Sequence, residues 1–390
     1  MNVEKIVVVG ASLAGLRTAE ALRRHGFAGS LTVIGDEAHA PYNRPPLSKS
    51  ALGENAELTD FQFPHDLGDD VTWRLGVRAV SADLDAGRVE LDDSDIETFD
   101  VLVAATGLTP RRLDLPGPAK GRHVVRTYDD ARALAPELRD HGTVVILGAS
   151  FIGCEIASAA RALGCDVTIV APETEPMIRV LGEELGAAMR RRHEANGVRF
   201  LLGRMPTACE GTERVENLHL DDGTVLTAPV VVEAVGCRPE TGWLDGNGLD
   251  LSDGVLCDNS LRAVGHERLF AVGDVARFPN PLIDDVPRRI EHWSMATDTG
   301  NQAARTLLGE PGEFRPVPSF WSDQVGLRIQ AYGVPGLADR HEVAVGKVDS
   351  DVVVHSYRDE RLVGVIGIGH RRALIIGRQR LIAEGAVALS

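Results

Sequence analysis

Two stretches decide the fold of this chain: KIVVVGASLAGLRTAEALRRHG at residues 5–26 and TVVILGASFIGCEIASAARALG at residues 143–164. Each stretch places a β-branched apolar run before Gly-Ala-Ser-x-x-Gly and an alanine-rich helical pattern after it. This order predicts a strand, a tight turn and a helix in both copies. A further strand is expected after each helix, LTVIG at 31–35 and DVTIVA at 166–171. Each copy therefore predicts a βαβ unit.

Both copies carry the glycine fingerprint of a dinucleotide-binding unit. The first glycine lets the chain turn sharply, the last lets the helix pack on the strand, and the free N–H groups of the helix N-terminus attract a pyrophosphate. Serine stands at the middle glycine position in both copies, and its effect on binding stays open. The predicted contacts are Gly10, Ser12, Leu13, Ala14 and Gly15 in the first copy, and Gly148, Ser150, Phe151, Ile152 and Gly153 in the second.

The composition limits the classes of function. The chain has 390 residues, enough for two or three domains, and 41 Lys and Arg against 57 Asp and Glu give a net charge of −16. Such an acidic chain is a poor partner for nucleic acid or an anionic membrane. No apolar stretch approaches the roughly 20 residues of a membrane helix. The apolar N-terminus belongs to the first fingerprint rather than to a signal peptide, so we expect a cytoplasmic protein. We also expect a monomer or weak dimer. Five cysteines without C-x-x-C or zinc-site spacing predict small buried side chains and no metal site.

The remaining segments complete an α/β architecture. HAPYNRPPLSK at 39–49 predicts a rigid loop, because its prolines exclude a helix or a central strand. LTPRRLDLPGP at 108–118 predicts a linker, and short strands between Pro and Gly turns begin near residue 315. We expect two Rossmann-like dinucleotide-binding domains and a small C-terminal α+β domain. The predicted boundaries are 1–110 with 237–314 for the first domain, 111–236 for the second and 315–390 for the third.

Two dinucleotide units in one chain suggest that two dinucleotides exchange electrons. The expected pair for electron transfer is FAD with a nicotinamide dinucleotide. Further motifs resemble the FAD-containing, NADH-dependent ferredoxin reductases of bacterial cytochrome P450 and Rieske oxygenase systems, to which apoptosis-inducing factor is related. These motifs are, in order, PYNRPPLSK, ATG at 105–107, GASFIGCE, FAVGDVA, RIEHW and FWSDQVG. The resemblance covers nearly the whole chain. It implies glutathione-reductase-like FAD and NAD domains, with FAD on the first unit and NADH on the second.

The resemblance also implies FAD contacts outside the fingerprint. Asp36 and Glu37 stand where a carboxylate accepts hydrogen bonds from the ribose of the adenosine half, although a solvated acidic turn is the alternative. The helix that starts at residues 291–293 can stabilise negative charge on the reduced flavin through its N–H groups. Ordinary core packing is the alternative for the two tryptophans. The implied contacts are Asp36, Glu37, Arg44, Lys49, Val80, Ala105, Thr106, Gly107, Arg126, Gly273, Asp274, Glu291, His292, Trp293 and Trp321.

Lys49, Glu155 and Glu291 are the catalytic residues that the resemblance implies. In the family, the residues matching Lys49 and Glu155 pair beside flavin N5. An ammonium there orients the ring and holds the anionic reduced flavin, while Glu155 and Glu291 fix the nicotinamide amide. The alternative is an interdomain ion pair of little energetic weight.

The second unit is expected to prefer NADH. Glu155, Glu173 and Gly236 join the fingerprint residues as implied NAD contacts. A carboxylate at Glu173, with Glu175 nearby, accepts hydrogen bonds from ribose hydroxyls and repels a 2′-phosphate. Arg179 lies close enough in the sequence to leave the strictness of this preference open.

The acceptor is expected to be a one-electron carrier. The loop after the first unit holds no cysteine, so electrons are expected to leave the flavin directly, one at a time, for an iron–sulfur ferredoxin that feeds a P450 or Rieske oxygenase. Two alternatives stay open: rubredoxin or oxygen as the acceptor, and a redox-sensing interaction protein similar to apoptosis-inducing factor. An acidic ferredoxin needs a local basic patch. We expect that patch at Arg288, Arg289, Arg315 and Arg328. The alternative for each arginine is a solvated charge or a bond to a local carboxylate.

Overall fold

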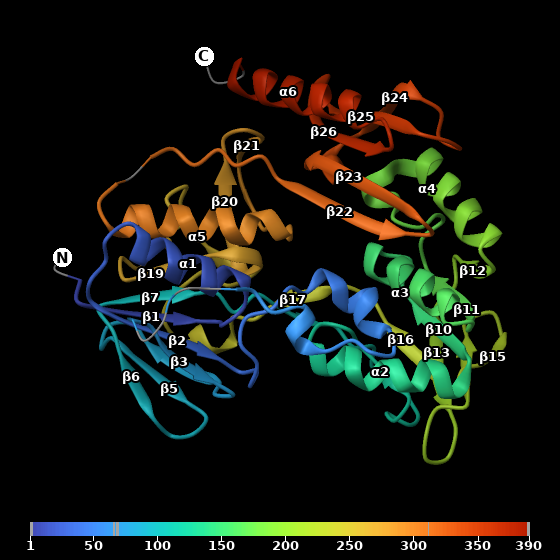
Figure 1. The fold of residues 1–390 in the computed structure, drawn as a ribbon, viewed down its shortest axis with the longest axis horizontal. Coiled ribbons are helices and arrows are strands. Elements are labelled where there is room, and N and C mark those ends of the chain that lie inside the picture. The colour runs from blue at the N-terminus through green and yellow to red at the C-terminus, as the bar shows by residue number, and fades with distance from the viewer. Residues whose placement is uncertain (1–2, 65–66, 68–69, 311, 388–390) are drawn as a thin grey trace.

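A computed structural model describes residues 3–64, 67, 70–310 and 312–387. Two lobes, each built on a parallel five-stranded sheet, lie side by side, and a third five-stranded sheet lies above the second lobe (Figure 1). The first lobe combines the blue start of the chain with an orange segment far along it, whereas green and yellow segments build most of the second. This arrangement confirms the predicted α/β fold with two Rossmann-like units and a C-terminal α+β domain.

The sheet of the first lobe has the strand order β19-β7-β1-β2-β3, with every pair parallel. Its outer helices α1 (Leu13–Arg24) and α5 (Trp293–Leu307) pack on each other. Gly300 permits this close approach, because a Cβ there would lie 2.9 Å from Thr18 Oγ1. The strands are β1 (Lys5–Val9), β2 (Ser30–Gly35), β3 (Thr72–Leu75), β7 (Val101–Ala104) and β19 (Leu269–Ala271).

The sheet of the second lobe repeats this design with the order β12-β11-β10-β16-β9, again parallel. Its central strand β10 is apolar and almost wholly buried, as a parallel strand covered on both faces should be. The helices are α2 (Tyr128–His141), α3 (Phe151–Ala162) and α4 (Ile178–Ala195). The strands are β9 (Arg122–His123), β10 (Thr143–Leu147), β11 (Asp166–Ala171), β12 (Val198–Leu202) and β16 (Val230–Glu233).

The proline-rich loop at 39–49 links the two lobes. Instead of lacking helix, as predicted, it contains the short 3₁₀ helix η1 (Pro45–Ser48), which η2 (Ser50–Leu52) follows. Proline fits the first turn of a helix, where no N–H is needed, so the prolines start this element rather than forbid it. The buried side chains of Tyr42, Leu47 and Leu52 belong to the same apolar core as helices α2 and α3 of the second lobe.

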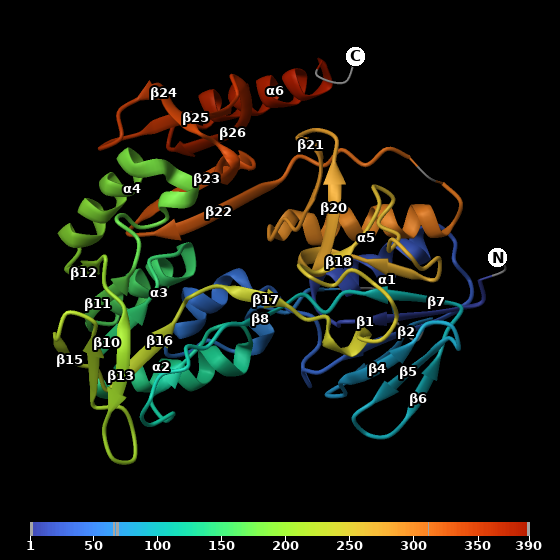
Figure 2. The same ribbon diagram turned by 180° about the vertical axis from the view of Figure 1, so that it is seen from behind.

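The chain crosses between the lobes through a two-stranded antiparallel ribbon, β8 (Leu108–Pro110) and β17 (Cys237–Pro239), visible from behind in Figure 2. The segment predicted as a linker thus begins as a strand, because its backbone pairs with the returning chain. The predicted domain boundaries at 110/111 and 236/237 fall in this ribbon, and they remain predictions.

The C-terminal sheet is antiparallel, with the order β22-β23-β26-β25-β24, and α6 (Arg371–Val387) packs against β26. Its strands are β22 (Ser319–Gln324), β23 (Leu327–Gly333), β24 (Arg340–Gly346), β25 (Val352–Arg358) and β26 (Arg361–Ile368). Of the helices in the described part of the chain, none has the length and the apolar run needed to cross a bilayer.

Smaller sheets complete the lobes. They are formed by β4 (Ala79–Asp83), β5 (Arg88–Leu91) and β6 (Ile96–Thr98), by β13 (Pro206–Glu210), β14 (Asn217–Leu220) and β15 (Val225–Thr227), and by β18 (Val255–Leu256), β20 (Ala276–Asn280) and β21 (Asp284–Arg288).

Candidate functional site: one cavity between two fingerprint turns

A single cavity of about 1110 Å³ is lined by both lobes. It is lined by the turn before α1, the turn before α3, the 39–49 loop, the start of α5 and strand β22. The predicted residues that line it are Gly10, Ser12, Leu13, Ala14, Asp36, Glu37, Arg44, Lys49, Ala105, Thr106, Gly107, Arg126, Ser150, Phe151, Ile152, Glu155, Gly236, Gly273, Asp274, Glu291, His292, Trp293 and Trp321. Strands and helices far apart in the sequence therefore bring most of the predicted site together.

Five predicted residues lie outside that lining: Gly15, Val80, Gly148, Gly153 and Glu173. Two of the glycines serve packing, because a Cβ on Gly15 would lie 1.9 Å from Gly10 O and a Cβ on Gly153 would lie 2.2 Å from Gly148 O. Val80 is 48% exposed, and its neighbour Ala79 lines the cavity instead.

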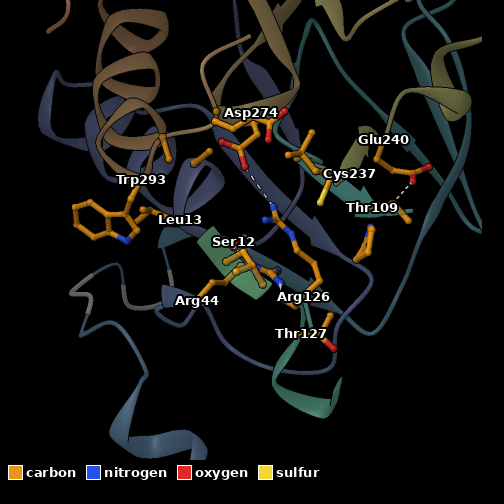
Figure 3. Close-up of a pocket in the computed structure, with 18 of the residues that line it drawn as sticks. Ser12, Leu13, Arg44, Thr109, Arg126, Thr127, Cys237, Glu240, Asp274 and Trp293 are labelled. Atoms are coloured by element: carbon orange, nitrogen blue, oxygen red, sulfur yellow. Dashed lines mark hydrogen bonds and ion pairs between the residues drawn. The ribbon is translucent and has the colours of Figure 1, made fainter. Parts of the chain in front are cut away.

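The first fingerprint turn presents free donors to the cavity. Ser12 is the N-cap of α1, yet its side chain caps no backbone N–H, so the first-turn N–H groups stay available for an anion. Arg44 donates from Nε to Ser12 Oγ at 3.1 Å and from Nη1 to the carbonyl oxygen of Arg126 at 2.6 Å. Arg126 in turn lies 3.3 Å from Asp274 Oδ2, as the dashed line in Figure 3 shows. The guanidinium of Arg44 thus lies beside the helix N-terminus, and that of Arg126 lies beside Asp274.

The two acids of the first copy have different surroundings. Glu37 accepts hydrogen bonds from Tyr42 Oη and Arg44 Nη2, both at 2.5 Å. Asp36 leaves 62% of its side chain exposed, with Arg78 4.0 Å away. Asp36 is therefore the freer carboxylate for a ligand at the cavity end. Sequence reasoning missed Tyr42, although it stands inside the quoted loop, because only the folded chain shows that its hydroxyl reaches Glu37.

The second fingerprint turn is closed by its own serine. Ser150 Oγ accepts from Gly153 N at 3.2 Å and donates to Ala234 O at 3.1 Å. The following acids also differ from the first pair: Glu175 binds Arg190 through two hydrogen bonds of 2.8 and 3.1 Å. Glu173 lies 3.7 Å from the exposed Arg179, the one ion pair that it forms among the described residues. Glu173 is thus the more available of the two carboxylates.

Lys49 and Glu155 meet across the two lobes. Lys49 Nζ lies 2.6 Å from Glu155 Oε2, and the Glu155 side chain is only 4% exposed. Ser48 Oγ donates to the same carboxylate oxygen at 2.5 Å. The 39–49 loop carries the lysine into the second lobe, and Glu155 is the fifth residue of α3, so the contact depends on how the lobes pack.

The start of α5 forms an aromatic wall. Trp293 and Trp321 both line the cavity, with ring centroids 5.8 Å apart in an edge-on arrangement. Burial lowers the pKa of His292 to about 4, so its ring is neutral near pH 7, and its Nδ1 has no hydrogen-bond partner among the described residues. Glu291, by contrast, is exposed and accepts from Arg289 Nη1 at 2.8 Å. A wall of this kind fits a bound heteroaromatic ring with polar edges.

Four of the five cysteines are buried, as predicted, and all five are free thiols. Cys237 is the exception, because it is only half-buried and its side chain lines the cavity (Figure 3). Burial raises the pKa of its thiol, so the thiol stays protonated near neutral pH. No second cysteine lies among the described residues of the lining.

Each of the four arginines of the expected basic patch has an acidic partner, as in the alternative of pairing with carboxylates, and the role of the patch in docking stays a prediction. Arg288 binds Asp284, Arg289 binds Asp253 at 2.7 Å, Arg315 binds Glu313 at 2.7 Å and Arg328 binds Asp323 at 2.7 Å. Each guanidinium therefore has a carboxylate beside it that cancels much of its field. The acidic composition of the chain makes such pairing common.

Comparisons with known proteins agree with this geometry. A family model described as pyridine nucleotide-disulphide oxidoreductase matches residues 4–300, and one described as reductase C-terminal matches residues 319–389. The chain is 34% identical to rhodocoxin reductase of Rhodococcus erythropolis over 97% of this chain and 90% of the relative. It is 35% identical to the ferredoxin–NAD(+) reductase component of an anthranilate 1,2-dioxygenase system of Burkholderia cepacia, over 99% and 96%. A solved covalent complex of putidaredoxin reductase with putidaredoxin matches with a TM-score of 0.92 at 26% identity, over 98% of this chain and 93% of that one.

Proposed function

The chain belongs to the pyridine nucleotide-disulphide oxidoreductase family, and we propose that it is an FAD-dependent NADH:ferredoxin reductase. In this proposal it passes electrons from NADH, through FAD, one at a time to a small iron–sulfur protein that feeds a cytochrome P450 or Rieske oxygenase. The observation that carries the proposal is the single cavity lined by both fingerprint turns, because it lets two dinucleotides meet at their reactive ends.

The residues of the first lobe fit FAD. The uncapped N-terminus of α1, with Arg44 beside it, suits a pyrophosphate. The wall formed by His292, Trp293 and Trp321 suits a flavin ring, and the unpartnered His292 Nδ1 offers a hydrogen-bonding group to a ligand. When bound, FAD supplies the chemistry of accepting a hydride and releasing its electrons singly.

The second lobe orients the nicotinamide. The first turn of α3 and Gly236 line the cavity opposite the first unit, and the Lys49 ammonium, fixed by Glu155, holds positive charge where the reacting rings meet. Glu173 stands free to accept from ribose hydroxyls and to repel a 2′-phosphate, which favours NADH. The catalytic roles of Lys49, Glu155 and Glu291 belong to this proposal.

Direct exit of electrons from the flavin agrees with the cysteines. A relay through a disulfide needs two thiols within bonding reach, and the described lining holds only Cys237. A one-electron carrier is then the suitable acceptor. All five cysteines are free, as in a reducing compartment, and we place the protein in the cytoplasm, where NADH is at hand.

The decisive experiment is steady-state oxidation of NADH with a panel of acceptors: a two-iron two-sulfur ferredoxin, a rubredoxin, oxygen and ferricyanide. We expect the highest kcat/KM among the protein acceptors for a ferredoxin. Faster reduction of rubredoxin, or of oxygen, would change the acceptor and keep the NADH-to-FAD chemistry. Slow turnover with every carrier, together with dimerisation on adding NADH, would favour the redox-sensing alternative.

The cofactor has a test of its own. The purified protein should be yellow with tightly bound, noncovalent FAD, seen as flavin absorbance that survives gel filtration and is released by denaturation. A folded, colourless preparation that takes up no FAD on reconstitution would contradict the assignment of the first unit.

A further inference from the structure

The carboxylate of Glu155 lies at one end of a buried chain of hydrogen bonds that reaches beyond the Lys49 pair. Ser322 Oγ donates to Glu155 Oε1 at 2.5 Å, and Gln324 Nε2 donates to Ser322 Oγ at 2.9 Å. His193 Nε2 lies 2.7 Å from Gln324 Oε1. All four side chains are at most 5% exposed, so water does not compete for these contacts.

The chemistry of each group fixes the direction of this chain. The carbonyl oxygen of Gln324 can only accept, so His193 donates through Nε2, and burial lowers the pKa of His193 and keeps it neutral near pH 7. The second ring nitrogen, Nδ1, has no partner among the described residues. Gln324 occupies a lone pair of the Ser322 hydroxyl, which leaves the single hydroxyl proton of Ser322 for Glu155. In every hydrogen bond of the chain, the donor is thus the group farther from Glu155 and the acceptor is the group nearer to it.

The chain joins three parts of the fold. Ser48 and Lys49 come from the 39–49 loop, Glu155 and His193 from helices α3 and α4, and Ser322 and Gln324 from strand β22. Each oxygen of Glu155 has its own donors: Oε2 receives Ser48 and Lys49, and Oε1 receives Ser322. A carboxylate held at both oxygens cannot rotate, so the position of the Lys49 ammonium is set from the C-terminal sheet as well.

The need for such a restraint is visible on the other side of the pair. Lys49 and Glu155 also line a second, smaller cavity of about 510 Å³, together with Gln324 and the tip of the β22–β23 hairpin. The Lys49–Glu155 pair therefore lies between the larger and the smaller cavity and lines both. Without a donor at Oε1, the carboxylate and its lysine have room to turn away from the larger cavity.

We propose that Ser322 and Gln324, anchored by His193, are positioning residues that hold Glu155, and through it Lys49, toward the larger cavity. This inference rests on the proposed function, because its consequence is a faster transfer of hydride from NADH to FAD. It gives the C-terminal sheet a part in that step, although none of these three residues needs to touch either dinucleotide.

The test compares Ser322→Ala with a matched control, Ser158→Ala. Ser158 Oγ accepts from Val325 N at 2.8 Å, so the control weakens the same contact between α3 and the hairpin without touching Glu155. In single-turnover reduction by NADH, Ser322→Ala should slow flavin reduction about tenfold, the loss expected for one hydrogen bond to a charged group. Gln324→Leu should act in the same direction, and Ser158→Ala should change the rate less than about twofold.

Coupling to Lys49 separates positioning from general destabilisation. If Ser322 acts through the ion pair, Ser322→Ala should lose most of its effect in a Lys49→Met background, to less than about twofold. A readout without turnover is the flavin absorbance maximum of the oxidised protein, which reports charge beside the ring. Ser322→Ala should shift that maximum in the same direction as Lys49→Met, and Ser158→Ala should not shift it.

Two outcomes would overturn the inference: an unchanged reduction rate in Ser322→Ala, or an equal slowing with and without Lys49. Loss of the proposed function would look different. In that case the unmodified protein itself would bind no FAD or would not be reduced by NADH.

Discussion

The two Gly-Ala-Ser-x-x-Gly turns have similar backbone conformations but different neighbouring side chains. Gly10 and Gly148 both adopt positive φ values, +119° and +103°. A Cβ on Gly10 would lie 2.1 Å from Ala105 O, just after β7, and a Cβ on Gly148 would lie 2.5 Å from Ala234 O, just after β16. The serines differ: Ser150 caps its own helix, whereas the Ser12 side chain caps no backbone N–H and receives Arg44 instead. The same local sequence therefore makes two sites, because the neighbouring elements decide which groups remain free for a ligand.

The acids repeat this lesson. In the first copy Glu37 is held by Tyr42 and Arg44 at the cavity wall. In the second copy Glu173 lies outside the described lining, with one exposed arginine near it. The first turn thus has one fixed cation, Arg44, beside it, which suits a permanently bound cofactor. The second is more open, as an exchanging substrate requires.

The largest expected difference between the copies comes from their first glycines. Gly10→Ala places a Cβ 2.1 Å from Ala105 O and should abolish FAD binding, measured as flavin absorbance per protein. Gly148→Ala places one 2.5 Å from Ala234 O and should raise KM for NADH more than about tenfold while FAD stays bound. Gly26→Ala is the control, since its φ is positive but its Cβ would meet open space. Equal loss of FAD in both variants would contradict the proposal that the first copy binds FAD and the second binds NADH.

The next largest effect is expected where the copies meet. Lys49→Met removes the ammonium beside Glu155 and leaves a buried carboxylate without its ion partner. Single-turnover reduction by NADH should slow roughly 100-fold with FAD retained. Lys347→Met, at an exposed position of the C-terminal domain, serves as the control. An unchanged reduction rate would mean that the Lys49–Glu155 pair has only a structural role.

A smaller effect is expected at the acid of the second copy. Glu173→Arg removes the repulsion of a 2′-phosphate and adds a partner for it, so the ratio of kcat/KM for NADPH to that for NADH should rise at least about tenfold. The equivalent change in the first copy, Asp36→Arg, should leave that ratio unchanged because FAD occupies that unit. If the ratio stays constant in Glu173→Arg, another residue discriminates between the nucleotides.

The smallest effect should separate the two serines. Ser150→Ala removes a helix N-cap and should lower the free energy of unfolding of the second lobe by about 1 kcal/mol. Ser12→Ala removes no cap, so its cost should be less than about half of that. Denaturant unfolding of the FAD-loaded protein measures both. A larger cost for Ser12→Ala would mean that its contact with Arg44 contributes more than a cap does.

Much of the site followed from local sequence. The βαβ units, the glycines that only a close backbone approach explains, and the acids after each second strand were all predictable, because these features depend on neighbours within about 30 residues. The motif resemblance added Lys49, Arg44, Arg126 and Asp274. Other contacts were not predictable in this way. Tyr42, Ser48, Ser322 and Gln324 stand inside the quoted motifs, but the motifs do not show which groups they contact. Ser48, Ser322 and His193 each meet a partner more than a hundred residues away along the chain.

The sequence by itself determined the two glycine turns and the helices that follow them, since a turn's backbone follows from glycine spacing and β-branched strands. Only the tertiary structure decided what surrounds each turn. The proline-rich loop crosses into the second lobe, β22 joins the cavity lining and reaches Glu155 through Ser322, and Arg289 meets Asp253 from a distant segment. These outcomes depend on which side chains come within a few ångströms of one another after folding. Ion pairing and burial act over that distance, regardless of separation along the chain.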